Sequence, residues 1–228
     1  MTIERNNGNN WCIDEGFVRC FLLEGAEKAI LIDTGASCAD AKALAEGGTD
    51  KPVGRGNTHG DGDHVAGNGA FAEFHMHPAD YEKCNVSARC PQSRLLPLQG
   101  GEVLDAGGRA LEIIAIPGHT YGSVAILDAD ERVLYTGDSV QDGHIYMFGA
   151  HRQPEAFAAS LEKLIAMEDR FDRIRAAHGT AELPAEFVRT VRDAWQQVQA
   201  GAVKSHPTEL HGRTVNTYDA AGCGFYCN

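Results

Sequence analysis

The sequence predicts an α+β fold in which sheets pack together and helices cover them from outside. Two observations support this prediction. Short β-favouring runs are followed by helical segments in both halves of the chain, as expected for sheets backed by helices. Polar, histidine-rich motifs directly follow several of these runs, and in such layouts reactive side chains gather on loops at one edge of the sheets. The order of elements therefore also predicts where the chemistry takes place.

The first half of the chain is rich in strands and carries two short helices. A Glu24-Gly25 turn joins the first two β-favouring runs, which predicts a hairpin. Ser37 can cap an alanine-rich helix that Gly47-Gly48 would end. The strands are predicted over 17–23, 28–32 and 52–57, and the helices over 39–46 and 78–84.

The second half repeats the pattern with longer helices. The predicted strands cover 103–104, 111–116, 124–127, 133–135 and 174–177. A helix over 154–167 places Phe157, Leu161 and Leu164 on one face. A second helix covers 185–199, and a β-rich tail follows it.

Length and charge limit the organisation and the partners of the protein. With 228 residues, the chain is long enough for one large domain, and we expect a single domain over 1–228. Its 23% charged and 43% hydrophobic residues are typical of a globular protein. Acidic residues outnumber basic residues 32 to 20, which gives a formal charge of −12. This charge argues against nucleic-acid partners and against anionic membranes.

Residues 1–7 lack the apolar core of a signal peptide, and no apolar run has the length of a membrane span. The seven cysteines are odd in number and scattered, unlike a disulfide framework: Cys12, Cys20, Cys38, Cys84, Cys90, Cys223 and Cys227. We therefore expect a cytoplasmic protein with reduced thiols. Cys223 and Cys227 could touch a second metal, but a structural role is favoured for this pair.

The most informative motif is His59-Gly60-Asp61-Gly62-Asp63-His64, which places two imidazoles and two carboxylates within six positions. Neutral imidazole and carboxylate are ligands that divalent metals prefer. The glycines allow a tight turn that lets neighbouring side chains converge. A polar surface loop could share this composition, but the motif favours a metal site.

Four further motifs occur in a fixed order with the first. They are Asp33-Thr34-Gly35, Gly118-His119-Thr120, Gly137-Asp138 and His178-Gly179. With these five motifs, the chain resembles the metallo-β-lactamase-fold hydrolases from about Phe17 to Gly179, and several ordered motifs are more specific than one. The resemblance implies a four-layer αβ/βα sandwich with a dinuclear metal cleft along one edge of its two facing sheets.

The resemblance also implies ligands for two divalent ions. His59 and His119 would serve the first metal, with Asp61 in the position of the superfamily's other histidine. The second metal would take Asp63, His64 and His178, and Asp138 would bridge both. Asp33 would support the ligand loops without touching metal, although a simple turn role fits it equally.

Asp61 departs from the superfamily's pattern because most members have a histidine there. A carboxylate adds one negative charge to the first site, so the metal should be a poorer Lewis acid. Oxygen ligands also shift the preference toward iron or manganese. We expect zinc, with iron or manganese as alternatives. A weak first site, with only the second one filled, is a further alternative.

The leading functional prediction is hydrolysis of a small ester, thioester or lactam-like substrate by a metal-bound hydroxide. Asp63 is the catalytic candidate that would orient the water and shuttle its proton. The segment 139–152 is expected to line the cleft, so Tyr146 and His144 are candidate substrate-binding residues. For Tyr146, packing in the core is the favoured alternative.

Two other functions fit the same motifs. An acidic residue at position 61 resembles the flavodiiron oxygen reductases, so a diiron redox protein is the runner-up. Those proteins carry an attached flavodoxin domain, for which this chain has no room. A metal-binding module with little catalysis is the third possibility. About two zinc ions per chain would favour the hydrolase, and iron with a visible charge-transfer band would favour the redox protein.

Overall fold

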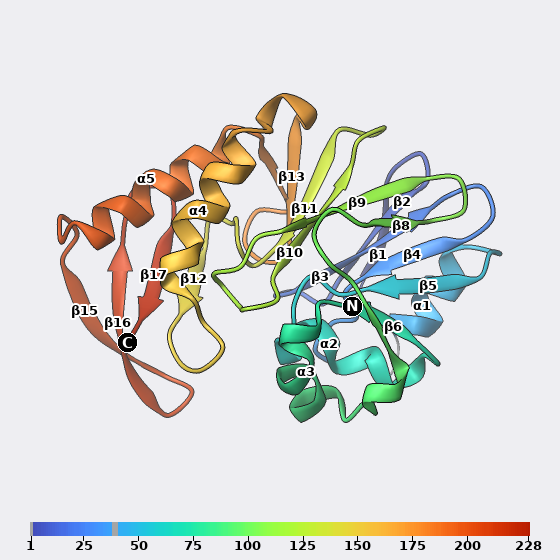
Figure 1. The fold of residues 1–228 in the computed structure, drawn as a ribbon, viewed down its shortest axis with the longest axis horizontal. Coiled ribbons are helices and arrows are strands. Elements are labelled where there is room, and N and C mark those ends of the chain that lie inside the picture. The colour runs from blue at the N-terminus through green and yellow to red at the C-terminus, as the bar shows by residue number, and fades with distance from the viewer. Residues whose placement is uncertain (1, 38–40) are drawn as a thin grey trace.

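The computed structural model describes residues 2–37 and 41–228. Its first sheet has seven strands in sequence order (Figure 1). Neighbours from β1 to β4 are antiparallel, whereas β4 to β7 run parallel. The change follows from the connections, because parallel neighbours need a crossover and the first helices supply it. The strands are β1 (Thr2–Asn7), β2 (Asn10–Asp14), β3 (Arg19–Glu24), β4 (Ala29–Ile32), β5 (Val53–Gly56), β6 (Phe74–Met76) and β7 (Leu95–Pro97).

The second sheet has six strands in the order β14-β13-β11-β10-β9-β8. Strands β8 to β11 form an antiparallel meander, and β13 pairs parallel with β11. The bounds are β8 (Val103–Asp105), β9 (Ala110–Ala115), β10 (Val124–Asp128), β11 (Val133–Gly137), β13 (Arg173–Ala176) and β14 (Glu182–Pro184).

A third sheet of four strands, in the order β12-β17-β16-β15, contains the predicted β-rich tail. It joins β12 (His144–Met147) to β15 (Ser205–Leu210), β16 (Arg213–Asp219) and β17 (Gly224–Cys227). Strand β12 pairs parallel with β17, so the segment after Asp138 lies beside the end of the chain. Figure 1 shows this sheet at one end of the molecule, beneath α4 and α5.

Helices lie outside the two large sheets, which gives the four layers. Helices α1 (Ala41–Gly48), α2 (Gly62–Val65) and α3 (Tyr81–Ala88) lie beside the first sheet, and α4 (Pro154–Ile165) and α5 (Phe187–Gln199) beside the second. Short 3₁₀ turns cover Ala66–Ala70, Pro78–Asp80, Gln92–Arg94 and Glu168–Arg170.

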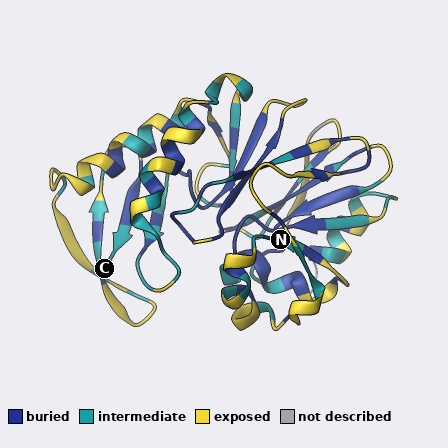
Figure 2. Cartoon of the chain, viewed as in Figure 1, coloured by how far each residue is buried: buried dark blue, intermediate teal, exposed yellow. Residues whose placement is uncertain are grey.

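The strands between these layers are largely buried (Figure 2), and their core side chains are apolar. Leu23 and Ile32 of the first sheet and Ile113 and Ile126 of the second share one buried cluster. A second cluster joins the other face of the second sheet, both long helices and the third sheet, where Trp195 lies 4.9 Å from Phe225 between ring centroids. The predicted α+β sandwich of four αβ/βα layers is therefore confirmed, with a third sheet added at its end.

Several predicted elements differ in extent from the observed ones. The predicted helix over 39–46 begins outside the described residues, and α1 continues through Gly47-Gly48 instead of ending before them. Strands β1 and β2 were not predicted. The polar β1 forms a strand because it pairs with β2, which in turn pairs with the buried β3. Among the residues described, no helix has the length and apolar character needed to cross a membrane. Cys38 lies outside these residues, and no disulfide joins the other six cysteines to one another.

Candidate metal centre

All seven predicted metal ligands lie at one edge of the two large sheets, on segments that follow strands. His59, Asp61, Asp63 and His64 follow β5, and His119, Asp138 and His178 follow β9, β11 and β13. Two of the local turns need glycine. A Cβ on Gly60 would lie 2.7 Å from the carbonyl oxygen of Asp80, and Gly137, with φ of +53°, lies against Thr58. These close approaches bring the ligand-bearing segments together.

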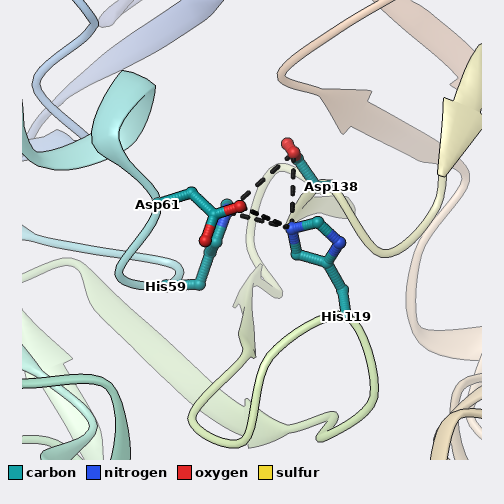
Figure 3. A group of neighbouring side chains, drawn as sticks. All are labelled: His59, Asp61, His119 and Asp138. Carbon is teal, nitrogen blue, oxygen red and sulfur yellow. Dashed lines mark hydrogen bonds and ion pairs between the residues drawn. The ribbon is translucent and has the colours of Figure 1, made fainter. Parts of the chain in front are cut away.

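The first group contains His59, Asp61, His119 and Asp138 (Figure 3), whose ligand atoms all lie within 4.8 Å of one another. The two imidazole Nε2 atoms are 3.2 Å apart. Asp61 Oδ2 lies 3.8 and 3.4 Å from Nε2 of His59 and of His119. Asp138 Oδ2 lies 3.9 and 3.5 Å from the same two atoms. Four donors about 2.1 Å from a tetrahedral metal are about 3.4 Å apart, so these separations fit a divalent ion.

The second group contains Asp63, His64 and His178, with the other oxygen of Asp138 beside it. Asp138 Oδ1 lies 3.0 Å from His64 Nε2 and 3.3 Å from His178 Nε2. Asp63 Oδ2 is 3.3 Å from His178 Nε2. Asp138 thus turns one oxygen to each group, which is the arrangement expected of a bridging carboxylate.

The four imidazoles present their Nε2 atoms to the centre because each Nδ1 has an oxygen partner elsewhere. Nδ1 of His64 lies 2.8 Å from Asp33 Oδ2. Nδ1 of His119 lies 3.1 Å from the carbonyl oxygen of Tyr146, and Nδ1 of His178 lies 2.5 Å from that of Phe17. These carboxylate and carbonyl oxygens can only accept, so each Nδ1 donates, and in the neutral imidazole each Nε2 keeps its lone pair.

His59 reaches the same state through a hydroxyl. Its Nδ1 lies 3.0 Å from Thr58 Oγ1, and that hydroxyl donates to Asp33 Oδ2 at 2.7 Å. The Thr58 oxygen therefore accepts from the imidazole. One carboxylate, Asp33, thus fixes two histidines, which is the supporting geometry expected of it.

Unpartnered buried atoms also fit a metal. His64 Nε2 and Asp138 Oδ1 are both buried and have no hydrogen-bond partner in the described part of the chain, although they lie only 3.0 Å apart. Buried polar atoms are rarely left without partners. A divalent ion would satisfy both at once, so the residues fit a metal in both groups.

The histidines of the two groups differ in their pKa values. Burial lowers the pKa of His59 and of His119 well below the usual range. Burial would also lower the pKa of His64, but the carboxylates of Asp138 and Asp33 outweigh it and raise that pKa. His178 behaves similarly, and its pKa rises to about 10, mainly because of Asp138. The second group therefore lies in the more negative surroundings.

Two cationic residues that the sequence analysis missed contact Asp61. Lys83 Nζ lies 2.7 Å from Asp61 Oδ1, and Arg152 Nη2 donates to Asp61 Oδ2 at 2.7 Å. Neither residue belongs to a motif, and Arg152 is 91 positions from Asp61. The unusual carboxylate at position 61 was the one available signal that a compensating charge would be nearby.

The centre opens into a cavity of about 820 Å³, which Asp61, Asp63, Asp138 and His178 help to line. The candidate substrate-binding residues Tyr146 and His144 also line it, together with Phe148 and Tyr226. The His144 ring stacks on Tyr226 at 4.6 Å, and its Nε2 lies 2.8 Å from Asp219 Oδ1. Cys223 and Cys227 belong to neither ligand group found among the described residues.

Two proteins with similar sequences match parts of this chain. It is 35% identical over 75 residues to the acyl-coenzyme A thioesterase MBLAC2 of Bos taurus, covering 33% of this chain and 27% of that protein. It is 30% identical over 164 residues to the hydroxyacylglutathione hydrolase of Microcystis aeruginosa, covering 67% and 61%. The chain thus matches less than two thirds of the length of either relative.

The fold comparison agrees with the sequence comparisons. A metallo-beta-lactamase from Pontibacter korlensis superposes with a TM-score of 0.72 at 16% identity, over 86% of this chain and 98% of that chain. The family model of the metallo-beta-lactamase superfamily matches residues 13–178, which contain four of the five motifs in full and His178 of the fifth. The chain therefore belongs to the metallo-beta-lactamase superfamily.

Proposed function

We propose that the protein is a metal-dependent hydrolase of small thioesters, with related esters as weaker substrates. The observation that supports this proposal is the position of Asp138, which turns one oxygen to each of the two ligand groups. Members of both groups line the same cavity. The relatives named above are a thioesterase and a hydroxyacylglutathione hydrolase, which favours thioesters over lactams. Two divalent ions, when bound, would polarise the carbonyl and activate water.

The roles proposed for this chain's own residues follow from their positions. His59, Asp61, His119 and Asp138 would hold the first ion, and Asp63, His64, His178 and Asp138 the second. Asp63 lines the cavity and would accept the proton of the attacking water on a carboxylate oxygen. Carbon–oxygen bond formation and carbon–sulfur cleavage then leave an acid and a thiolate, which the same proton neutralises.

The pKa of Asp63 agrees with a proton-accepting role. Burial would raise this pKa, but His178 and His64 outweigh burial and hold it below the usual range. The carboxylate is therefore ionised at neutral pH and able to accept a proton.

The wall of the cavity is proposed to bind the substrate through packing. The ring of Tyr146 lies 5.5 Å from Phe148 and 5.0 Å from Tyr226. Tyr146→Phe keeps this packing and should leave KM within about twofold, whereas Tyr146→Ala should raise KM about tenfold. A large loss of kcat in Tyr146→Phe would instead indicate that the hydroxyl donates to the reacting oxygen.

The activity test uses the purified full chain with its metal content measured first. We expect zinc near two per chain and release of free thiol from a glutathione thioester or an acyl-coenzyme A. Lactones and phosphodiesters serve as comparison substrates. In the thioester assay, Asp63→Asn should lower kcat by at least about 100-fold. Iron with a charge-transfer band and no thiol release would contradict the hydrolase and favour the diiron redox protein.

Metal-free protein that gains no stability from zinc, iron or manganese would contradict both functions.

Four expectations remain predictions of the sequence. They are localisation in the cytoplasm, reduced thiols, the single domain over 1–228 and the lack of nucleic-acid or membrane partners.

A further inference from the structure

Asp61 differs from the other carboxylates of the centre because each of its oxygens is in an ion pair with a lysine or an arginine. Oδ1 lies 2.7 Å from Lys83 Nζ, and Oδ2 accepts from Arg152 Nη2 at 2.7 Å. Asp63 and Asp138, in contrast, form ion pairs only with histidines in the part of the chain that the structure describes. Asp33 likewise has His64 as its ion-pair partner. The two full cations thus contact the first group alone.

Lys83 and Arg152 reach Asp61 from separate elements and are largely buried there. Lys83 belongs to α3, and Arg152 lies just before α4. The Arg152 side chain is 7% exposed and that of Lys83 is 22% exposed. Burying a cation is costly unless a partner carries the opposite charge. Asp61 is the one carboxylate of the described residues that forms an ion pair with either.

Arg152 also lies directly beside the first metal position. Its Nη1 donates to the His119 carbonyl at 2.6 Å and lies 3.1 Å from His119 Nε2. That Nε2 is the atom that His119 would offer to a metal. A guanidinium at this distance therefore repels a divalent ion bound to the same nitrogen.

The two metal positions differ in the charges of the side chains around them. The carboxylates of Asp61 and Asp138 at the first position are balanced by Lys83 and Arg152. Asp63 and Asp138 face the second position, and Asp33 contacts the other ring nitrogen of its His64. Among the described residues, no lysine or arginine forms an ion pair with these three carboxylates. We propose that Lys83 and Arg152 weaken divalent-ion binding at the first position, so that the position of Asp63, His64, Asp138 and His178 fills first.

A purely mechanical role for the two cations makes the opposite prediction. If Lys83 only held Asp61 in place, its removal would loosen a ligand and weaken the first position. If Lys83 acts through its charge, its removal takes away repulsion and tightens that position. The direction of the change in metal affinity therefore decides between the two roles.

The test is a zinc titration of chelator-treated protein against a chromophoric competitor. We expect two classes of site whose affinities differ by at least about tenfold. Lys83→Met should tighten the weaker class about tenfold and leave the stronger class unchanged, whereas Lys83→Arg should change neither. Lys42 pairs with Glu46 on α1, and Lys42→Met is the matched control that should also change neither.

Two further variants assign the classes to positions. Asp61→Asn should abolish the weaker class, and Asp63→Asn should abolish the stronger class. Weaker zinc binding in Lys83→Met, a single class in the wild type, or the reverse assignment would each overturn the proposal. Circular dichroism checks folding, and Lys83→Gln replaces Lys83→Met if the latter does not fold. The titration reads metal binding alone, so its outcome is independent of whether the protein hydrolyses thioesters.

Discussion

At the scale of single residues, Asp33 determines which imidazole nitrogens face the metals. Its Oδ2 accepts from the Thr58 hydroxyl at 2.7 Å and from His64 Nδ1 at 2.8 Å, and its Oδ1 accepts from the Thr58 amide at 2.8 Å. All three contacts require an acceptor. A carboxylate meets this requirement at both oxygens, and an amide of the same shape meets it at only one.

Asp33→Asn therefore has a specific expected effect. If the asparagine oxygen accepts from the Thr58 amide, its NH₂ faces His64 Nδ1 and favours the tautomer with hydrogen on Nε2. That tautomer cannot ligate a metal, so occupancy of the second position should fall about 10- to 100-fold. Metal analysis after dialysis against a weak chelator measures the change. Unchanged occupancy would mean that Asp33 serves only the turn.

Asp138 is the ligand candidate that faces both metal positions, so its loss should affect both. Its Oδ2 faces His59 and His119, and its Oδ1 faces His64 and His178. Asp138→Asn removes the shared negative charge and should lower the affinity of both positions by at least about 100-fold. Retention of one tightly bound ion in this variant would show that Asp138 does not bridge.

At the scale of elements, a buried arginine connects the two large sheets. Arg109, just before β9, donates Nε to Asp128 at 2.9 Å and Nη2 to Asn10 Oδ1 at 2.7 Å. Asp128 is fully buried. Arg109→Met leaves this carboxylate without its cation, so the free energy of unfolding should fall by about 3–5 kcal/mol. Urea denaturation measures it, and loss of the exposed Arg132–Asp172 pair in Arg132→Ala should lower the free energy of unfolding far less.

A second buried arginine, on β5, has the opposite expectation. Arg55 is 1% exposed, none of its three side-chain nitrogens has a hydrogen-bond partner among residues 2–37 and 41–228, and burial lowers its pKa to about 9. Its guanidinium lies 4.2 Å from the Phe71 ring centroid, which offsets only part of the cost of desolvation. Arg55→Met should therefore raise the free energy of unfolding by about 1–3 kcal/mol. A decrease of that size would mean that the aromatic contacts outweigh the unmade hydrogen bonds.

These elements also show what could be predicted from the sequence. The strands with continuous apolar runs, such as β4 and β10, were predicted nearly to the residue because their hydrophobic residues specify burial directly. Strand β1 is polar and became a strand only through pairing with β2, which no local pattern encodes. The seven ligand candidates lay in short motifs. Lys83 and Arg152 were missed because only the folded chain brings them to Asp61.

At the scale of the whole molecule, the third sheet extends the fold beyond the region matched by the superfamily model. That model ends at residue 178, whereas β15 begins at residue 205, and β16 and β17 follow it. The pairing of β12 with β17 brings Tyr226 beside Tyr146 on the cavity wall. The region matched by the superfamily model thus contains all seven ligand candidates, and the end of the chain shapes the cavity in front of them.

The metal centre should also contribute to the stability of the whole fold, because its ligands come from segments distributed between residues 59 and 178. A ligand that binds only the folded state stabilises it by RT ln(1 + [L]/Kd), about 4 kcal/mol when free metal is 1,000 times Kd. Removing the metal with a chelator should therefore lower the free energy of unfolding by about that amount, and added zinc should restore it. Differential scanning calorimetry at fixed protein concentration measures the shift. Asp138→Asn provides the control, because a variant without the bridging carboxylate should melt at nearly the same temperature with and without zinc. A chelator effect of equal size in this variant would show that the stabilising metal binds elsewhere.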